Sequence, residues 1–488
     1  MATFRAFAPA PNSQLDRAAR RPDDRAVSPP AKQTIRVPTA VQPERAVAPK
    51  PGVWDGVTFY HWLVLVIAAA GWLFDCMGQR IFVLARQPAL KELLGSAATD
   101  ADVTRWGSLA TAVLMVGWAT GGIGFGIMSD RWGRVKTMVA TLMAYTVFSG
   151  LSGLARDGNE FLIYRFLCGL GVGGMFGSAT TLVAESVPAR VRPLALGAMQ
   201  ALSSFGNMIG SSLSLWIPPG QADFWHGYAG WRWIFFAGAA PAVLAVPIAL
   251  LLREPEPWKE AKRRAREHRG AATQVGSIAD LFRHPTRRRN TFVGIALGLA
   301  GMAGLWGIGF FSPELISTAL RNEPQSVVST VRAYGTILQD VGSFLGMLTF
   351  TLVATYVGRR RAFGGAFVLC LASTVFVFNF LKSGADAYWM LPLMGFAQLS
   401  VFGGYSIYFP ELFPTRLRGT GVSFCYNTVR YLAAVFPLLL GGLNKLLQQQ
   451  GVNEPFRKAA TILSFVFVLG LVALIWAPET KGQPLPED

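Results

Sequence analysis

The chain has 488 residues, of which 52% are hydrophobic and 15% are charged, and its mean hydropathy is +0.36. An ordinary soluble enzyme is less apolar and more charged, so this class is excluded. The net charge of +17 could indicate a nucleic-acid-binding protein, but the basic residues gather in short stretches between apolar runs, which is typical of loops beside a membrane.

Residues 1–58 are rich in Ala, Pro and Arg and show no apolar periodicity, which predicts a disordered cytosolic tail. From Phe59 onward, apolar segments follow one another, and each is about 20 residues long, enough to cross a hydrocarbon core of about 30 Å. The predicted spans are 60–84, 106–128, 137–155, 160–185, 194–217, 231–252, 291–313, 331–356, 362–382, 388–411, 419–442 and 457–477. They predict an all-α membrane protein with about twelve transmembrane helices in two pseudo-symmetric six-helix bundles, at 59–253 and 291–477.

A basic linker, 254–290, joins the two predicted bundles, and 478–488 form a short cytosolic tail. Arg and Lys concentrate in this linker and in the loops expected on the same side, whereas most loops on the other side carry few. Basic loops of membrane proteins stay in the cytosol. Both termini are therefore predicted to be cytosolic, with the protein in the cell (plasma or inner) membrane.

Two phrases of the sequence occur twice, at an offset close to half the chain length. Glu-x-x-Pro-x-Arg-x-Arg begins at Glu185 and again at Glu411, and Gly133–Lys136 has a counterpart in Gly358–Arg361, with offsets of 226 and 225 residues. A third pair, Pro255-Glu256 and Pro478-Glu479, ends the two halves. Such repetition predicts two copies of one bundle, which is how alternating-access transporters are built.

These residues resemble the signatures of the major facilitator superfamily. Gly126–Lys136 is similar to the signature of the loop after its second helix, and Arg165–Gly174 is similar to its fourth-helix signature. Pro410–Gly421 and Pro478–Gly482 resemble its sugar and metabolite:proton symporter branch. The resemblance covers residues 59–482 and implies the two-bundle fold and transport by alternating access.

The resemblance also implies a cytosolic gate that latches that side closed. Gly126 lets a neighbouring helix approach closely, and Asp130 can pair with arginine or accept from a helix N-terminus across the two halves. The second copy has Thr351 and Thr355 where the family has Gly and Asp, so an asymmetric gate is expected. The alternative is that the basic residues serve topology alone. The predicted gate residues are Gly126, Asp130, Arg131, Gly133, Arg134, Glu185, Arg190, Arg192, Arg359, Arg360, Glu411, Arg416 and Arg418.

Ionisable side chains inside membrane spans usually mark function, because burying them in lipid is costly. A rise of about 1.5 Å per residue puts Asp75 and Arg165 at similar depths, roughly 21 and 22 Å from the cytosolic face. The sequence therefore predicts an Asp75–Arg165 pair, and its similarity to the acid–arginine switch of proton-coupled sugar porters implies proton coupling. Protonation of Asp75 would release Arg165 and bias the conformational equilibrium. A purely structural pair is the alternative.

The same calculation puts Asp340 and Arg430 near the midplane, roughly 16 and 17 Å above the cytosolic face. They are predicted to form a second pair. This pair either ties two helices of the second half together, or Arg430 binds an anionic substrate while Asp340 tunes it. An arginine in the eleventh helix resembles organic-anion carriers more than sugar carriers.

Polar and aromatic side chains complete the predicted substrate cavity. A polar stripe at helical spacing runs through 200–207, and a polar and aromatic stripe runs through 398–409. Gln200 matches, by resemblance, a glutamine that contacts substrate in sugar porters. For any single member, helix packing is the alternative. The predicted substrate-binding residues are Gln200, Asn207, Gln398, Tyr405, Asn427, Arg430 and Asp340.

Together these features predict a monomeric secondary active transporter that uses a proton gradient to import a small polar metabolite, an organic acid or a sugar-like acid. A proton-coupled or facilitative sugar carrier is the alternative within this class, and a non-transporting membrane sensor is the alternative outside it. No enzyme activity, cofactor, metal site or nucleic-acid partner is expected. The chain has no Gly-Lys dipeptide for a P-loop, and its four histidines and four cysteines lack metal-ligand spacing.

Overall fold

The computed structural model describes residues 54–267 and 275–487, within one compact unit, Gly52–Asp488. The predicted tail lies, up to residue 53, outside the described residues, and so do residues 268–274 of the predicted linker. The described residues form helices and no strand, which confirms the predicted all-α fold.

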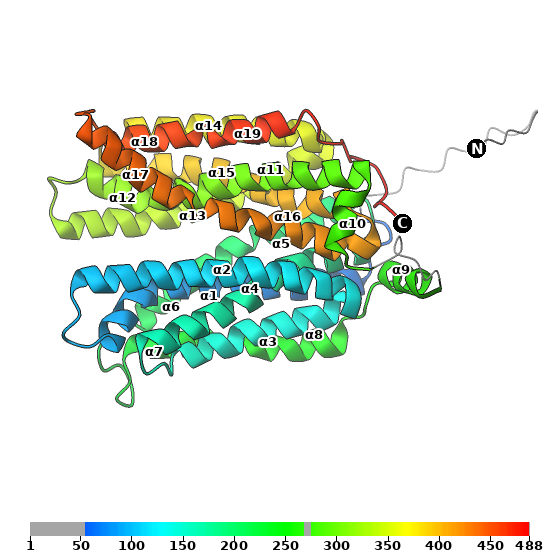
Figure 1. The fold of residues 1–488 in the computed structure, drawn as a ribbon, viewed down its shortest axis with the longest axis horizontal. Helices are drawn as coiled ribbons and strands as arrows, with labels where there is room; N and C mark the ends of the chain where they lie inside the picture. The colour runs from blue at the N-terminus through cyan, green and yellow to red at the C-terminus, as the bar shows by residue number, and fades with distance from the viewer. Residues whose placement is uncertain (1–53, 268–274, 488) are drawn as a thin grey trace, which may run out of the picture. The chain divides into compact units, whose positions relative to one another are not determined.

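Each predicted span contains one helix or consecutive helices with short breaks. The first half contains α1 (Phe59–Leu93), α2 (Asp100–Trp132), α3 (Arg134–Ser152), α4 (Gly158–Ser186), α5 (Arg192–Ala201), α6 (Ser203–Trp216), α7 (Gly230–Ala237), η1 (Ala240–Leu244) and α8 (Ala245–Leu251). The second half contains α11 (Pro285–Gly307), η3 (Gly309–Phe311), α12 (Ser312–Ala319), α13 (Gln325–Tyr356), α14 (Arg359–Phe380), α15 (Gly384–Leu412), η4 (Thr415–Leu417), α16 (Arg418–Ala433), α17 (Phe436–Gln449), α18 (Pro455–Ser464) and α19 (Val466–Ala473). Figure 1 shows the halves as two groups of helices, with the linker helices α9 (Glu256–Glu267) and α10 (Ile278–Arg283) at one end, which we call the basic end.

Ten helical stretches of the described residues are long and apolar enough to cross a membrane. Two predicted spans, 137–155 and 194–217, are helical but are not among these ten. The first falls on α3, whose 19 residues include several Ser and Thr. The second is divided at Leu202 into α5 and α6, of 10 and 14 residues. At this break the Ser203 hydroxyl donates to the Gln200 carbonyl, a local bond that competes with the helical backbone pattern.

A sharp turn at a glycine precedes the third helix of each half. Gly133 has a φ of 125° and Gly358 a φ of 118°, a region that residues with a Cβ rarely adopt. The first N–H groups of α3 then donate to the Glu254 carboxylate, and those of α14 donate to Glu479. A carboxylate at this place satisfies N–H groups that lack a partner within the helix and complements the helix dipole.

Glu254 and Glu479 are 225 residues apart, which is also the offset between the two glycine turns. Pairing Glu256 with Glu479 from the sequence is therefore wrong. The Glu256 side chain is exposed and bonds Lys259 at 2.7 Å instead. The repeat extends further into the structure than the sequence phrases indicate.

Two helix seams join the halves, with α2 packed against α16 and α5 packed against α13. At the first seam, Gly126 faces Ser423 so closely that a Cβ on the glycine would collide with the serine side chain. At the second seam, Gly197 gives the same room to Thr351. The glycine belongs to the first half in both cases. Thr351 is the second-half equivalent of Gly126, and Gly197 provides the space that its side chain needs.

Candidate functional site

A cavity of about 340 Å³ lies between the two halves, within the size range of small-molecule sites. Along α1 its wall runs from Trp72 to Arg86, away from the basic end, and α13 forms the facing wall from Arg332 to Ser343. The cavity therefore reaches from the middle of the helices toward the end opposite α9 and α10.

At the inner end of the cavity, the Arg430 guanidinium lies among aromatic rings. Its Cζ atom is 3.5 Å from the centroid of the Trp118 ring and 5.0 Å from that of Tyr426. Tyr426 in turn stacks on Phe176, with centroids 3.8 Å apart. The Arg430 Nε donates to the Asn427 side chain at 3.3 Å. A cation held between rings in this way is kept in one orientation.

Several buried polar atoms beside the cavity have no hydrogen-bond partner in the described part of the chain. Three are donors, namely Trp72 Nε1, Trp118 Nε1 and Arg430 Nη1, and one is an acceptor, Gln200 Oε1. All four residues line the cavity. Since nearly all buried polar groups in proteins are hydrogen-bonded, this cluster points to a ligand. Its chemistry suits a carboxylate for the donors and a flat apolar body for the rings.

Asp75 lies directly behind this wall and is fully buried. Its Oδ2 accepts from Gln79 at 3.2 Å, whereas Oδ1 has no partner among the described residues. Its charge interacts with that of Arg430, which belongs to the other half.

The predicted Asp75–Arg165 pair is wrong. Arg165 donates to the Ser152 hydroxyl and to the Phe148 carbonyl of α3, and its guanidinium lies 4.8 Å from the Phe235 ring centroid. Helical depth gives the height of a side chain but not the direction in which it points. Arg165 points into the first half, away from the cavity.

The predicted Asp340–Arg430 pair is also wrong. Asp340 accepts from Arg80 Nη2 at 2.6 Å, and this ion pair joins α13 of the second half to α1 of the first. The two side chains are 18% and 25% exposed and both line the cavity. Arg80 escaped the sequence analysis although it lies inside the span 60–84, where any ionisable residue is a candidate.

The remaining predicted binding residues divide into two groups. Gln200 and Asn207 line the cavity. Gln398 donates to Thr374 at 2.9 Å, and Tyr405 donates to the Leu297 carbonyl at 2.6 Å, so both are used in packing within the second half. Asn427 holds Arg430 from behind. The sequence analysis missed Trp72, Trp118, Tyr426 and Gln79, because aromatic and amide residues in apolar helices resemble ordinary core positions.

At the basic end, four charged side chains that are 0% exposed close the interface between the halves. Arg134 of α3 donates to Asp130 and to Glu185, both at 2.9 Å, and Arg418 of α16 donates to Glu185 at 2.6 Å. Arg134 also donates to the Thr415 carbonyl at 2.9 Å, so the contacts run from one half to the other. We call Asp130, Arg134, Glu185 and Arg418 the gate cluster.

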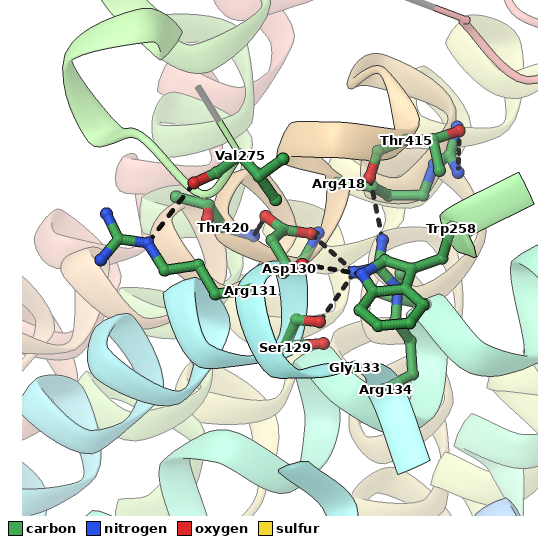
Figure 2. Close-up of polar contacts among 12 residues, drawn as sticks. Ser129, Asp130, Arg131, Gly133, Arg134, Trp258, Val275, Thr415, Arg418 and Thr420 are labelled. Atoms are coloured by element: carbon green, nitrogen blue, oxygen red, sulfur yellow. Dashed lines mark hydrogen bonds and ion pairs between the residues drawn. The ribbon is translucent and has the colours of Figure 1, made fainter. Parts of the chain in front are cut away.

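Asp130 connects the gate cluster to the first turn of α16. Its two carboxylate oxygens accept from the Gly419 and Thr420 N–H groups at 3.0 and 2.7 Å. Figure 2 shows this carboxylate beside Arg134, with the Trp258 ring of α9 covering the arginine. The Trp258 indole donates to the Asp130 carbonyl at 2.7 Å. The linker thus covers the gate cluster.

The second copy of the motif makes a weaker connection. Arg359 donates to Glu411 at 2.7 Å inside the second half, and Thr355, which replaces the aspartate, bonds the Thr351 carbonyl of its own helix. The gate geometry is asymmetric, as expected. Of the other predicted gate residues, Arg416 pairs with Asp280 at 2.8 Å, Arg131 donates to the Val275 carbonyl, Arg192 is half-buried, and Arg190 and Arg360 are exposed.

Comparisons with known proteins agree with this architecture. The family model of the Major Facilitator Superfamily matches residues 56–438. The cis,cis-muconate transport protein of Acinetobacter baylyi is 28% identical over 67% of this chain and 76% of its own length, and the niacin transporter of the same organism is 23% identical over 87% and 96%. A solved proton:xylose symporter shares the fold, with a TM-score of 0.67 and 18% identity over 87% of this chain and 98% of that chain. Since the family model spans most of the sequence, the protein belongs to the Major Facilitator Superfamily of membrane transporters.

Proposed function

We propose that the protein is a proton-coupled importer of a small organic acid with a planar, unsaturated or aromatic body. The observation that carries this proposal is the cluster of unpartnered donors on Trp72, Trp118 and Arg430, beside stacked rings, at the closed end of a cavity. The three donors and the ring faces suit a carboxylate on a flat body, whereas a sugar would rely on the amides and hydroxyls in the rest of the lining, such as Gln79, Ser203 and Asn207. Relatives named for the transport of cis,cis-muconate and niacin, both organic acids, support the same conclusion.

Alternating access in this proposal moves the two halves about the cavity. The gate cluster keeps the basic end closed while the cavity opens at the other end. We place the basic end in the cytosol, because basic segments of membrane proteins remain there, with both termini cytosolic and the protein acting as a monomer in the cell membrane. Two contacts would stabilise the outward-facing state, namely the hydrogen bonds from the α16 N-terminus to Asp130 and the ion pair between Arg418 and Glu185.

In the proposed coupling step, Asp75 and the substrate compete for the charge of Arg430. Ionised Asp75 neutralises part of that charge, so its protonation leaves Arg430 free to attract the substrate carboxylate. The ionisable neighbours of Asp75 are Cys76, Tyr145, Cys168, Tyr426 and Arg430. Linkage is reciprocal: if protonation of Asp75 strengthens the binding of the acid, then bound acid favours the protonation of Asp75 to the same extent.

Asp75→Asn is expected to abolish accumulation of the acid while exchange continues. The amide keeps the shape of the carboxylate but carries no proton in or out, so the internal concentration should stop at the external one. Counterflow of labelled against unlabelled acid should persist and should lose its pH dependence. Accumulation at the wild-type level in the variant would remove Asp75 from the coupling step.

The proposed function is tested with the purified full-length protein in proteoliposomes. Benzoic acid crosses lipid by itself, so uptake of labelled benzoate is measured relative to protein-free liposomes. We expect this protein-dependent uptake to rise when the outside is acidified, to collapse with a protonophore, and to be inhibited by nicotinate but not by xylose. Inhibition by xylose alone would favour the sugar carrier. Saturable binding of benzoate without any uptake would favour the membrane sensor.

A further inference from the structure

The cavity carries more positive charge than one carboxylate requires. Its lining includes Arg80, Arg86, Arg332 and Arg430 but only two acidic residues, Asp340 and Glu314. With Asp75 behind the wall as a third carboxylate, the four arginines leave an excess of one positive charge while Asp75 is ionised and of two once it is protonated. Such an excess inside a low-dielectric cavity attracts anions and discriminates among them by charge.

Two of these arginines border the same compartment from opposite halves. Arg430 lies at the inner end on α16, and Arg80 lies on α1, one helical turn beyond Cys76. The Cys76 side chain lines the same cavity. Along α1, Arg80 is about 7.5 Å beyond the level of Asp75. Because Arg80 and Arg430 line one cavity of about 340 Å³, a single ligand can contact both.

The Arg80–Asp340 ion pair does not prevent Arg80 from binding a ligand. Asp340 accepts from Nη2 at 2.6 Å, and a guanidinium carries five N–H donors. Both side chains line the cavity and are partly exposed, Arg80 at 25% and Asp340 at 18%. Asp340 thus orients Arg80 and lowers the local positive charge, while the guanidinium still presents donors to the compartment.

We propose that the substrate is a dianion, a compact dicarboxylate with one carboxylate on Arg430 and the second on Arg80. This inference rests on the proposed function and names its substrate class more narrowly. Arg80 and Arg430 belong to different halves, so a dicarboxylate would add a second charged contact between the halves, at Arg80. Asp340 competes with the second carboxylate for Arg80. A ligand without that second carboxylate gains nothing from Arg80, so Asp340 contributes to specificity.

The test compares benzoate with terephthalate, which differ by one carboxylate on the same ring. Affinities are measured by isothermal titration of the purified full-length protein in detergent. We expect terephthalate to bind the wild type about tenfold or more tightly than benzoate, as one further charge-assisted bond implies. Arg80→Gln should remove this preference. Because it also leaves the Asp340 carboxylate uncompensated in the cavity, it should weaken benzoate binding as well, but by a smaller factor than terephthalate binding. Arg80→Lys, which keeps the charge, should retain part of the preference.

Asp340→Asn separates ligand binding from a structural role of the ion pair. If Arg80 binds the second carboxylate, removing Asp340 raises the affinity for terephthalate, so the two substitutions act in opposite directions. If the pair only joins the halves, Arg80→Gln and Asp340→Asn weaken both ligands alike, and the proposal is overturned. Equal affinities of the wild type for the two acids overturn it as well. If the inference is overturned but benzoate binding still depends on Arg430, the proposed function stands. If neither acid binds, the proposed function fails together with the inference.

Discussion

Arg430→Lys is expected to reduce uptake of an aromatic acid by about a hundredfold, although it keeps the positive charge. Replacing one partner of a buried, hydrogen-bonded charge pair costs about 2–5 kcal/mol, and each 1.4 kcal/mol is about tenfold in affinity. Lysine lacks the planar guanidinium that lies against Trp118 and bonds Asn427, so it cannot hold a donor in the place of the unpartnered Arg430 Nη1. The measurement is the initial rate of benzoate uptake into proteoliposomes.

Arg457→Lys is the matched control. Arg457 is also buried in the second half, at 3% exposure, but it bonds the Phe378 and Leu381 carbonyls and does not line the cavity. A general sensitivity of buried arginines would reduce uptake in both variants. If Arg430→Lys kept uptake within about threefold of the wild type while folding normally, a positive charge alone would suffice. The proposal that the guanidinium binds the substrate carboxylate through directed hydrogen bonds would then be refuted.

Glu185→Gln should open the basic end. Glu185 accepts from Arg134 of the first half and from Arg418 of the second, so the neutral amide leaves two buried arginines with less negative charge than they require. Breaking a buried ion-pair network by removing one partner costs about 3–5 kcal/mol. The loss falls on the conformation in which the halves meet at this end. The population of the conformation that is open at the basic end should rise accordingly.

The opening is measured by the labelling of Ser129→Cys, a position that is 0% exposed beside the gate cluster, in a background without the four native cysteines. With Glu185→Gln, the labelling rate by a maleimide applied from the basic side should increase about tenfold or more. Glu256→Gln is the control, because its exposed pair with Lys259 is worth about 1 kcal/mol at most. A lower melting temperature with unchanged labelling would mean that Glu185 stabilises the fold without controlling the gate.

The sequence predicted the helices and their repetition because both follow from local patterns. Apolar length sets a span, a glycine and a proline set its ends, and the offset of about half the chain is visible in the motifs. The sequence matched Glu479 with Glu256, whereas the structure matches it with Glu254. This equivalence depends on which carboxylate reaches the N-terminus of α3, and that is a tertiary contact. No sequence phrase marks that contact.

The partners of the buried charges could not be predicted in the same way. Asp75, Asp340 and Arg430 were found because ionisable residues in apolar spans are rare, and the structure gathers them around the cavity. Their pairing depends on the direction of each side chain around its helix and on which helices are neighbours across the halves. Depth contains neither quantity, so Arg165 was paired with the wrong helix and Arg80 was missed. Their roles in transport remain predictions.

The placement of the two seam glycines has a mechanical consequence. Gly126 and Gly197 both belong to the first half, and the side chains that fill the space beside them, Ser423 and Thr351, both belong to the second. A rigid-body movement of the second half can withdraw both of these side chains from the glycines, so the halves can separate there while every helix keeps its internal geometry.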